Sequence, residues 1–249
     1  MNKSIKIVVD ESYYNLGLVH WINFDFLYKE GQRLLICGPS GSGKTVLATS
    51  ILGKLSIYLP NVLVYLVDYK GIDFRFCNGC INYYPVDKAM EGIENFFSLF
   101  EDRLYNKIPC TPHAVLFTDE ISSLILSLPK KEADELKNKM ARLLNLSRAL
   151  NITVITALQR PSAELFANGA RDNYNIRFLM GNMANNKESV SMIASEFKDY
   201  IEPCKTGVGY LITDNGIKKI RSVMPKNKEK LHTVIREAVN RSLQGGAEQ

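Results

Sequence analysis

The sequence has no apolar run long enough to cross a membrane. Its longest hydrophobic segments, such as residues 62–67 (VLVYLV), fall far short of the roughly 20 residues that a membrane-spanning helix takes. The first residues, MNKSIKIVVDES, are polar and alternate as a strand does, which argues against a secretory signal. We therefore expect a cytoplasmic protein, which a partner would have to recruit if it works at a membrane.

Cysteine is also sparse. The five cysteines are an odd number scattered over strand-like and loop-like segments, so they form no disulfide framework and suit a reducing compartment. Two pairs, Cys77 with Cys80 and Cys110 with His113, have the short spacing of zinc ligands, but a long stretch separates the pairs. We expect ordinary, partly buried cysteines here, and a zinc site is the less favoured alternative.

Internal repeats and low-complexity segments are absent too. With 46% hydrophobic residues, a chain of 249 residues can bury a large core. We expect one main domain at residues 31–225, preceded by a short β element at 1–30 and followed by a basic helix and tail at 226–249.

The net charge of +5 is modest and unevenly distributed. Residues 217–241 contain eight Lys/Arg against two acidic residues, which leaves 23 basic and 24 acidic residues in the rest of the chain. A basic terminal segment on a neutral body is typical of a nucleic-acid contact, but a solvated surface helix has the same pattern. Both interpretations stay open on the sequence alone.

The most informative motif of the chain is QRLLICGPSGSGKT, residues 32–45, where an apolar strand stops at a glycine-rich loop. Its glycines allow successive amide N–H groups to point at phosphate oxygens. Lys44 supplies a charge for the β and γ phosphates, and the hydroxyl of Thr45 can ligate Mg²⁺. The predicted ATP-binding residues are Gly38, Pro39, Ser40, Gly41, Ser42, Gly43, Lys44, Thr45 and Val46.

Apolar runs of strand length alternate with segments of helical spacing along most of the chain. Strands are predicted at residues 5–9, 22–26, 33–37, 62–67, 80–86, 114–117, 152–158 and 176–180. Helices are predicted at residues 46–55, 90–104, 131–150, 190–197 and 227–243. Residues 209–213 and 217–223 flank an Asn-Gly pair that suits a hairpin turn. The pattern predicts an α/β domain with a mainly parallel sheet flanked by helices.

Polar residues follow the predicted parallel strands, at the edge where ligands bind in open α/β sheets. Besides the glycine-rich loop, these residues are Asp68, Asp119 with Glu120, and Gln159. With Mg²⁺ held by Thr45 and Asp119, Glu120 would orient a water for attack on the γ-phosphate. Gln159 would reach the γ-phosphate or that water. The arrangement predicts ATP hydrolysis, although an acidic pair can also mark the start of a helix.

The order GPSGSGKT, VDYKG, AVLFTDE, ALQRPSAELFANGARDNYNIRF and GVGYLIT resembles the motor domain of the FtsK/SpoIIIE group within the HerA-FtsK superfamily of DNA-pumping ATPases. The resemblance covers roughly residues 31–223, and the QRP element after a strand is its most specific part. It implies a RecA-like sheet, hexameric rings, and ATP-driven movement of double-stranded DNA, or alternatively single-stranded DNA, through a pore.

The same resemblance implies roles for individual residues. It makes Lys44 part of Walker A, Asp119 and Glu120 the Walker B pair with its catalytic acid, and Gln159 a sensor. It also implies that Arg177 is the arginine that reaches the ATP of a neighbouring subunit, with Arg171 and Arg160 as substitutes. The alternative for Arg177 is a surface ion pair.

The sequence departs from this family in length. We expect the separate α-subdomain to be reduced or missing, with no membrane anchor and no winged-helix module. A minimal motor of a mobile element, plasmid or phage fits best, with a relaxase, a capsid or a membrane protein as partner. A viral-type DNA-packaging ATPase and a type VII secretion-like ATPase that moves protein are the alternatives. An ABC-transporter domain is disfavoured, because FEDRLYNKIPCTPH stands where an LSGGQ-like signature would be.

Overall fold

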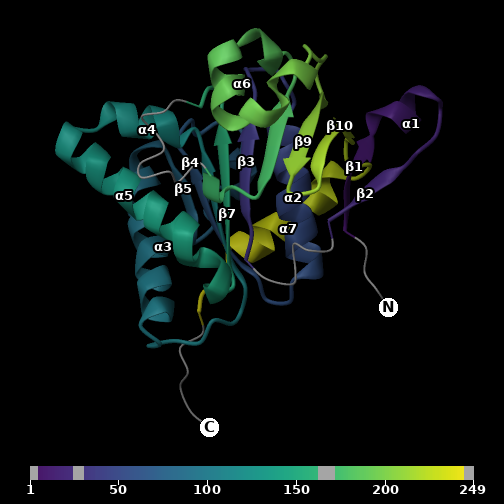
Figure 1. The fold of residues 1–249 in the computed structure, drawn as a ribbon. Coiled ribbons are helices and arrows are strands. Elements are labelled where there is room, and N and C mark those ends of the chain that lie inside the picture. The colour runs from purple at the N-terminus through teal and green to yellow at the C-terminus, as the bar shows by residue number, and fades with distance from the viewer. Residues whose placement is uncertain (1–4, 25–30, 162–171, 244–249) are drawn as a thin grey trace.

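The computed structural model describes residues 5–24, 31–161 and 172–243. In this part of the chain one ten-stranded sheet, in the order β2-β1-β10-β9-β8-β3-β7-β6-β4-β5, separates two layers of helices (Figure 1). None of the helices in these residues is both long and apolar enough to span a membrane. The single sheet between two helix layers confirms the predicted α/β class with a mainly parallel sheet.

Six strands pair in parallel and form the part of the sheet that carries the predicted site. In sheet order they are β8 (Ile176–Met180), β3 (Arg33–Cys37), β7 (Ile152–Leu158), β6 (Ala114–Asp119), β4 (Leu63–Asp68) and β5 (Tyr83–Pro85). Every residue of β6 and β7 is buried, since helices cover both faces of this region. This two-sided burial explains why these strands appear in the sequence as unbroken apolar runs.

Four further strands extend the sheet antiparallel beyond β8. They are β9 (Val208–Thr213), β10 (Gly216–Ser222), β1 (Lys6–Asp10) and β2 (Trp21–Asn23). The hairpin predicted around Asn215-Gly216 joins β9 to β10, and Gly216 has a φ of +102° there, a conformation that favours glycine. Because β1 pairs with β10, the N-terminal strands continue the same sheet. The division at residues 30 and 225 stays a prediction.

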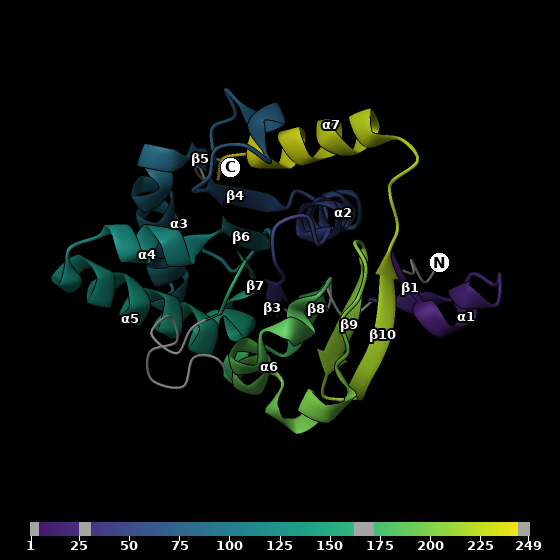
Figure 2. The same cartoon turned by 90° about the horizontal axis from the view of Figure 1, so that it is seen from above.

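The helices form two separate layers. On one face lie α2 (Lys44–Tyr58) and α7 (Lys228–Val239), and on the other lie α3 (Ala89–Leu104), α4 (Ile121–Ser127), α5 (Lys130–Leu146) and α6 (Lys187–Ile193) (Figure 2). The short α1 (Glu11–Asn15) lies at the outer edge beside β1 and β10. Each layer buries its own hydrophobic core against the sheet.

The sequence did not predict α1 or α4, and the helix predicted at 190–197 begins at Lys187 and ends at Ile193 in the structure. The chain leaves α6 after Ile193, because Ala194 adopts an extended φ of −151°, and it continues as the 3-10 helix η8 (Ser195–Tyr200). Both missed helices have only five to seven residues. Helices this short carry too few apolar repeats for periodicity to reveal them.

The last helix packs directly on the helix that follows the glycine-rich loop. Leu231, Ile235 and Val239 of α7 are buried in the core that α2 shares with the sheet. At Gly53 of α2 an added Cβ would lie only 2.1 Å from Leu231 Cδ1, so the two helices approach each other where α2 has no side chain. The amphipathic helix predicted from the sequence is thus α7, and its apolar face packs against α2.

Beneath the parallel strands, at their amino ends, His113 is buried as a neutral side chain. It precedes β6, and its Nε2 lies 2.8 Å from Thr153 Oγ1 of β7. Burial lowers the pKa of His113 to about 4, and the charge of Arg103 adds to the effect against an opposing contribution from Asn151. The folded protein therefore excludes the proton that an unfolded chain would take up.

We predict that His113 makes the fold acid-sensitive in a defined window. Its pKa is about 6.5 when unfolded and about 4 when folded, so the stability it contributes is fully present above pH 6.5 and is lost as the pH falls toward 4. Between pH 7 and pH 4.5, urea unfolding should show wild type losing about 2 kcal/mol more stability than His113→Gln. The exposed His20→Gln should follow wild type, and a parallel loss in His113→Gln would contradict the prediction.

Candidate nucleotide-binding and hydrolysis site

The glycine-rich loop leaves β3 at Cys37 and enters α2 at Lys44, as expected of a phosphate-binding loop. Gly43 caps the helix with a φ of +95°, a backbone conformation that other residues rarely adopt. At Gly38 a Cβ would lie 2.7 Å from the carbonyl oxygen of Met180 at the end of β8, so a side chain has no room there. The loop therefore places backbone amides at the N-terminus of α2, where anions bind favourably.

Lys44 and Thr45, which the sequence assigns to phosphate and Mg²⁺, are both paired inside the protein. Lys44 Nζ donates to the carbonyl oxygens of Gly38 and Pro39. Burial lowers the pKa of Lys44, and the nearby ammonium of Lys70 lowers it further. Thr45 Oγ1 donates to Asp73 Oδ2 at 3.0 Å. A triphosphate would have to replace these contacts.

Asp119, at the end of β6, is the predicted magnesium ligand. It is buried, and among the described residues its Oδ2 has no hydrogen-bond partner. Burial raises the pKa of Asp119 to about 7, with Lys70 opposing the shift and the neighbouring carboxylates, led by Asp68, adding to it. A buried carboxylate oxygen without a partner is a suitable ligand for Mg²⁺, which prefers oxygen donors. Asp119 and Thr45 would together hold the ion, which would neutralise charge on the phosphates.

Glu120, the predicted catalytic acid, lies where β6 passes into α4. Its φ of 59° is in the left-handed region, which is costly for a residue with a side chain and is concentrated at functional sites. Ser122 Oγ donates to Oε1 at 2.8 Å, and the backbone N–H of Gln159 donates to Oε2 at 3.2 Å. Lys70 Nζ lies 3.2 Å from the same Oε2. The structure thus brings Glu120 and Gln159 together, through the main chain of Gln159.

The loop after β4 is the part of the site that the sequence did not assign. It contributes Lys70 to Glu120 and Asp73 to Thr45. Asp68 itself does not point toward a nucleotide, because its oxygens accept from the backbone N–H groups of Gly71 and Phe74 and from a tyrosine hydroxyl. The polar run DYKGID directly after a buried strand was the signal available in the sequence.

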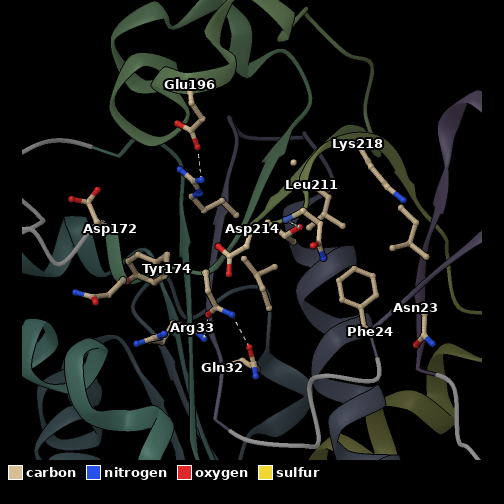
Figure 3. A pocket seen from close by; sticks show the side chains of 18 of the residues that line it. Asn23, Phe24, Gln32, Arg33, Asp172, Tyr174, Glu196, Leu211, Asp214 and Lys218 are labelled. Atoms are coloured by element: carbon tan, nitrogen blue, oxygen red, sulfur yellow. Dashed lines mark hydrogen bonds and ion pairs between the residues drawn. The ribbon is translucent and has the colours of Figure 1, made fainter.

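Arg177 lies apart from the phosphate-binding loop of its own subunit. Along β8 the side chains alternate, so Ile176 and Phe178 face the core under α2 whereas Arg177 faces the α6 side. Its guanidinium group donates to the carbonyl oxygen of Ile193 and, at 2.6 Å, to Glu196 Oε1 on η8. Figure 3 shows Glu196 with the dashed line that marks this ion pair. Arg177 thus lies on the face of β8 opposite α2, the helix that follows the phosphate-binding loop.

A cavity of about 1000 Å³ lies beside Arg177, at the opposite end of β3 from the phosphate-binding loop. Figure 3 shows Gln32 and Tyr174 on its wall, with Glu196 reaching in from above. Of the two substitutes considered for Arg177, Arg160 is exposed, and Arg171 lies outside the described residues. Of the three candidate arginines, Arg177 is the one that is partly buried and ion-paired in the described residues.

The alternative zinc site is not assembled. Cys77 and Cys80 lie in the core on the α2 side, and Cys80 Sγ contacts the carbonyl oxygen of Arg236. His113 is engaged with Thr153 instead. No cluster of three or more potential metal ligands from His, Cys, Asp and Glu occurs in the described residues. The long separation between the two pairs in the sequence thus corresponds to separate places in the fold.

Comparison with known proteins identifies the family to which the chain belongs. The model of the ATPase family associated with various cellular activities (AAA) matches residues 34–182, which is more than half of the chain and includes the glycine-rich loop and the β6 acids. The chain belongs to this ATPase family. Both the nucleotide-binding and the ATPase predictions from the sequence are confirmed.

This AAA-family ATPase is similar to proteins of the FtsK type. It is 26% identical over 210 residues to the DNA translocase FtsK of Staphylococcus aureus (strain Mu50), in an alignment that covers 68% of this chain and 26% of FtsK. The chain therefore spans about a quarter of the length of that relative. The resemblance to an FtsK-type motor domain, stated from the motifs, is confirmed.

Two solved structures share the fold of this AAA-family ATPase. The monomer form of the pCW3 conjugation coupling protein TcpA with ATPγS has a TM-score of 0.72 and 17% identity, covering 95% of this chain and 71% of TcpA. The cytoplasmic domain of the type VII secretion ATPase EccC of Thermomonospora curvata has a TM-score of 0.63 and 19% identity, covering 95% of this chain and 31% of EccC. Likeness at these identities extends to the fold and does not indicate the cargo.

We predict that two substitutions separate binding from hydrolysis. Lys44→Ala should abolish ATP binding, because it removes the cation of the phosphate site. Glu120→Gln should still bind ATP but hydrolyse it about 10²- to 10⁴-fold more slowly, since the phosphate cradle is intact and only the proton acceptor is lost. Fluorescent-nucleotide titration and phosphate release measure the two effects, with the exposed Lys107→Ala as control. Wild-type hydrolysis by Glu120→Gln would refute the assignment.

Proposed function

We propose that this ATPase is a DNA translocase, in which a homo-oligomeric ring, expected to be a hexamer, couples ATP hydrolysis to the movement of double-stranded DNA. The observation that carries the proposal is the alignment with the DNA translocase FtsK over 68% of the chain. The setting we infer is a minimal motor of a mobile element, plasmid or phage. Its partners would be DNA and a docking protein such as a relaxase, a capsid component or a membrane protein.

The proposed catalytic cycle assigns each step to a residue of this chain. The loop amides and Lys44 bind the phosphates, and Thr45 and Asp119 would hold Mg²⁺, which would neutralise charge on the phosphates. Glu120 then accepts the proton of the attacking water on a carboxylate oxygen as that water attacks the γ-phosphate. Gln159, whose backbone is tied to Glu120, is suited to report whether the γ-phosphate is present.

The DNA contact in this proposal is the outer face of α7 and the segment before it. One face of α7 is buried on α2, which leaves its basic side chains exposed. These exposed cations are Lys226, Lys228, Lys230 and Arg236. They support contacts with the phosphate backbone, which carry no sequence information and so suit a motor that moves along any DNA.

We predict that duplex DNA of arbitrary sequence stimulates ATP hydrolysis and that the stimulation weakens steeply with salt, because DNA binding releases counterions. Lys228→Gln combined with Lys230→Gln should weaken DNA binding and reduce the slope of log affinity against log salt by about two. The matched control is Lys130→Gln with Lys131→Gln, two exposed positions on α5. Absence of DNA binding at low salt would refute the proposal in favour of a protein-moving ATPase.

We predict that Arg177 acts on the ATP of a neighbouring subunit. Such arginines contribute 10³-fold or more to hydrolysis, whereas an exposed ion pair contributes roughly 0 to 1 kcal/mol. Arg177→Ala should therefore bind ATP but fail to hydrolyse it.

An experiment with mixed subunits distinguishes a role of Arg177 in hydrolysis from a structural role. Mixed rings of Arg177→Ala and Glu120→Gln subunits, each inactive alone, should recover part of the activity, because some interfaces then pair an intact Glu120 with an intact Arg177. Rings of Glu120→Gln alone are the control. Confirmed mixed rings without any recovery would contradict the assignment in trans.

A further inference from the structure

Arg177, to which the proposed function assigns a role in a neighbouring subunit, is held by the segment at the end of α6. Its Nη1 donates to the carbonyl oxygen of Ile193, the last residue of α6, and its Nη2 lies 2.6 Å from Glu196 Oε1 on η8. The Arg177 side chain is 21% exposed, and its buried Nε has no hydrogen-bond partner in the described part of the chain. Glu196 is thus the carboxylate that fixes the direction of this guanidinium group.

The backbone that carries Glu196 is anchored on both sides. Ala194 before it is fully buried, and Phe197 after it packs against the core while its N–H donates to the carbonyl oxygen of Ala194 at 3.0 Å. Burial tends to raise the pKa of Glu196, but its own backbone N–H and the Arg177 guanidinium lower that pKa overall. Glu196 is therefore a charged carboxylate at neutral pH, and it extends from a backbone that the core holds in place.

The ion pair leaves N–H donors of Arg177 available. A guanidinium group has five N–H donors in a fixed plane. The contacts with Ile193 and Glu196 engage one donor on each Nη, so each of these nitrogens keeps a second N–H. A phosphate oxygen could accept from those groups without breaking the ion pair. Contact with Glu196 is thus compatible with contact between Arg177 and a phosphate.

The cavity of about 1000 Å³ beside Arg177 provides room for a phosphate group, and both Arg177 and Glu196 line it. Figure 3 shows Glu196 reaching toward this space from above. Among the described residues of its wall, the Arg and Lys side chains are Arg33, Arg148, Arg177 and Lys218, and the acidic side chains are Asp172, Glu196 and Asp214. The wall therefore has no excess of negative charge that would repel an anion.

We propose that Glu196 is a positioning residue, which orients the guanidinium group of Arg177 for contact with ATP bound to a neighbouring subunit. The inference rests on the proposed role of Arg177. Removal of Glu196 would leave the cation in the chain but would let the guanidinium group rotate. A donor stabilises developing charge most strongly when it is held in the right direction in advance, so this rotation would slow hydrolysis.

The test compares the ATP hydrolysis rate of Glu196→Ala rings with that of wild-type rings on duplex DNA. The variant should bind ATP within about twofold of the wild-type affinity and hydrolyse it about 10- to 100-fold more slowly, since a misplaced catalytic group costs up to about 10²-fold. Glu196→Gln keeps an oxygen acceptor and should hydrolyse ATP at an intermediate rate. The matched control is Glu202→Ala, because Glu202 pairs with Lys219 on the surface and should affect neither quantity.

Two combinations of variants distinguish positioning from a purely structural role. Mixed rings of Glu196→Ala and Glu120→Gln should hydrolyse ATP faster than rings of either variant alone, because some interfaces then pair an intact Glu120 with a correctly oriented Arg177. Arg177→Ala combined with Glu196→Ala in one chain should be no slower than Arg177→Ala alone, since the two residues act as one unit.

Four results would overturn the proposal. A wild-type rate in Glu196→Ala would show that Glu196 orients nothing, and a faster rate would show that it holds Arg177 back. A further loss in the double variant would show that Glu196 acts through another residue, and slow mixed rings without any gain would make its role structural. Arg177→Ala distinguishes the levels. If that variant hydrolyses ATP normally, the proposed role of Arg177 fails; if it is inactive while Glu196→Ala is not slowed, only the positioning role fails.

Discussion

The register of the parallel strands is the constraint on which the whole site depends. Cys37 of β3 pairs with Leu158 of β7, and Asp119 of β6 pairs with Ala157 of β7. Asp68 of β4 pairs in turn with Asp119. This alignment brings the ends of four strands to one edge of the sheet, although the segments are far apart in sequence. A slip of one residue in any strand would turn its terminal side chain to the other face and remove it from the site.

Several of the groups at this edge are bonded to one another. Lys44 donates to loop carbonyl oxygens, Thr45 donates to Asp73, and Glu120 forms an ion pair with Lys70. Asp119, in contrast, is the carboxylate whose buried oxygen lacks a partner among the described residues. In the proposed function, binding of the substrate would exchange these internal contacts for contacts with phosphate and metal. Such an exchange would couple occupation of the site to the conformation of the β4 loop, because that loop supplies two of the partners.

Much of this could be predicted because the decisive signals are local in the sequence. A glycine-rich loop between a strand and a helix, or an acidic pair after a buried strand, is visible within about ten residues. The pairs of Lys70 with Glu120 and of Asp73 with Thr45 join segments that only the tertiary fold brings together, so no spacing rule reveals them. The sequence offered an ion pair as the alternative for Arg177, but it did not identify Glu196 as the partner, for the same reason. The short α4 was missed because seven residues give too little periodicity.

The close contact of Gly53 with Leu231 has a mechanical consequence. The N-terminus of α2 bears the phosphate-binding loop, and its flank is locked to the basic terminal helix through a contact that leaves no space for an added methyl group. Interiors packed this tightly transmit displacement instead of absorbing it. A small rotation of α2 would therefore move α7 and its exposed basic side chains with it, because the two helices are in direct contact. Displacement at the phosphate-binding loop would in this way reach the outer surface.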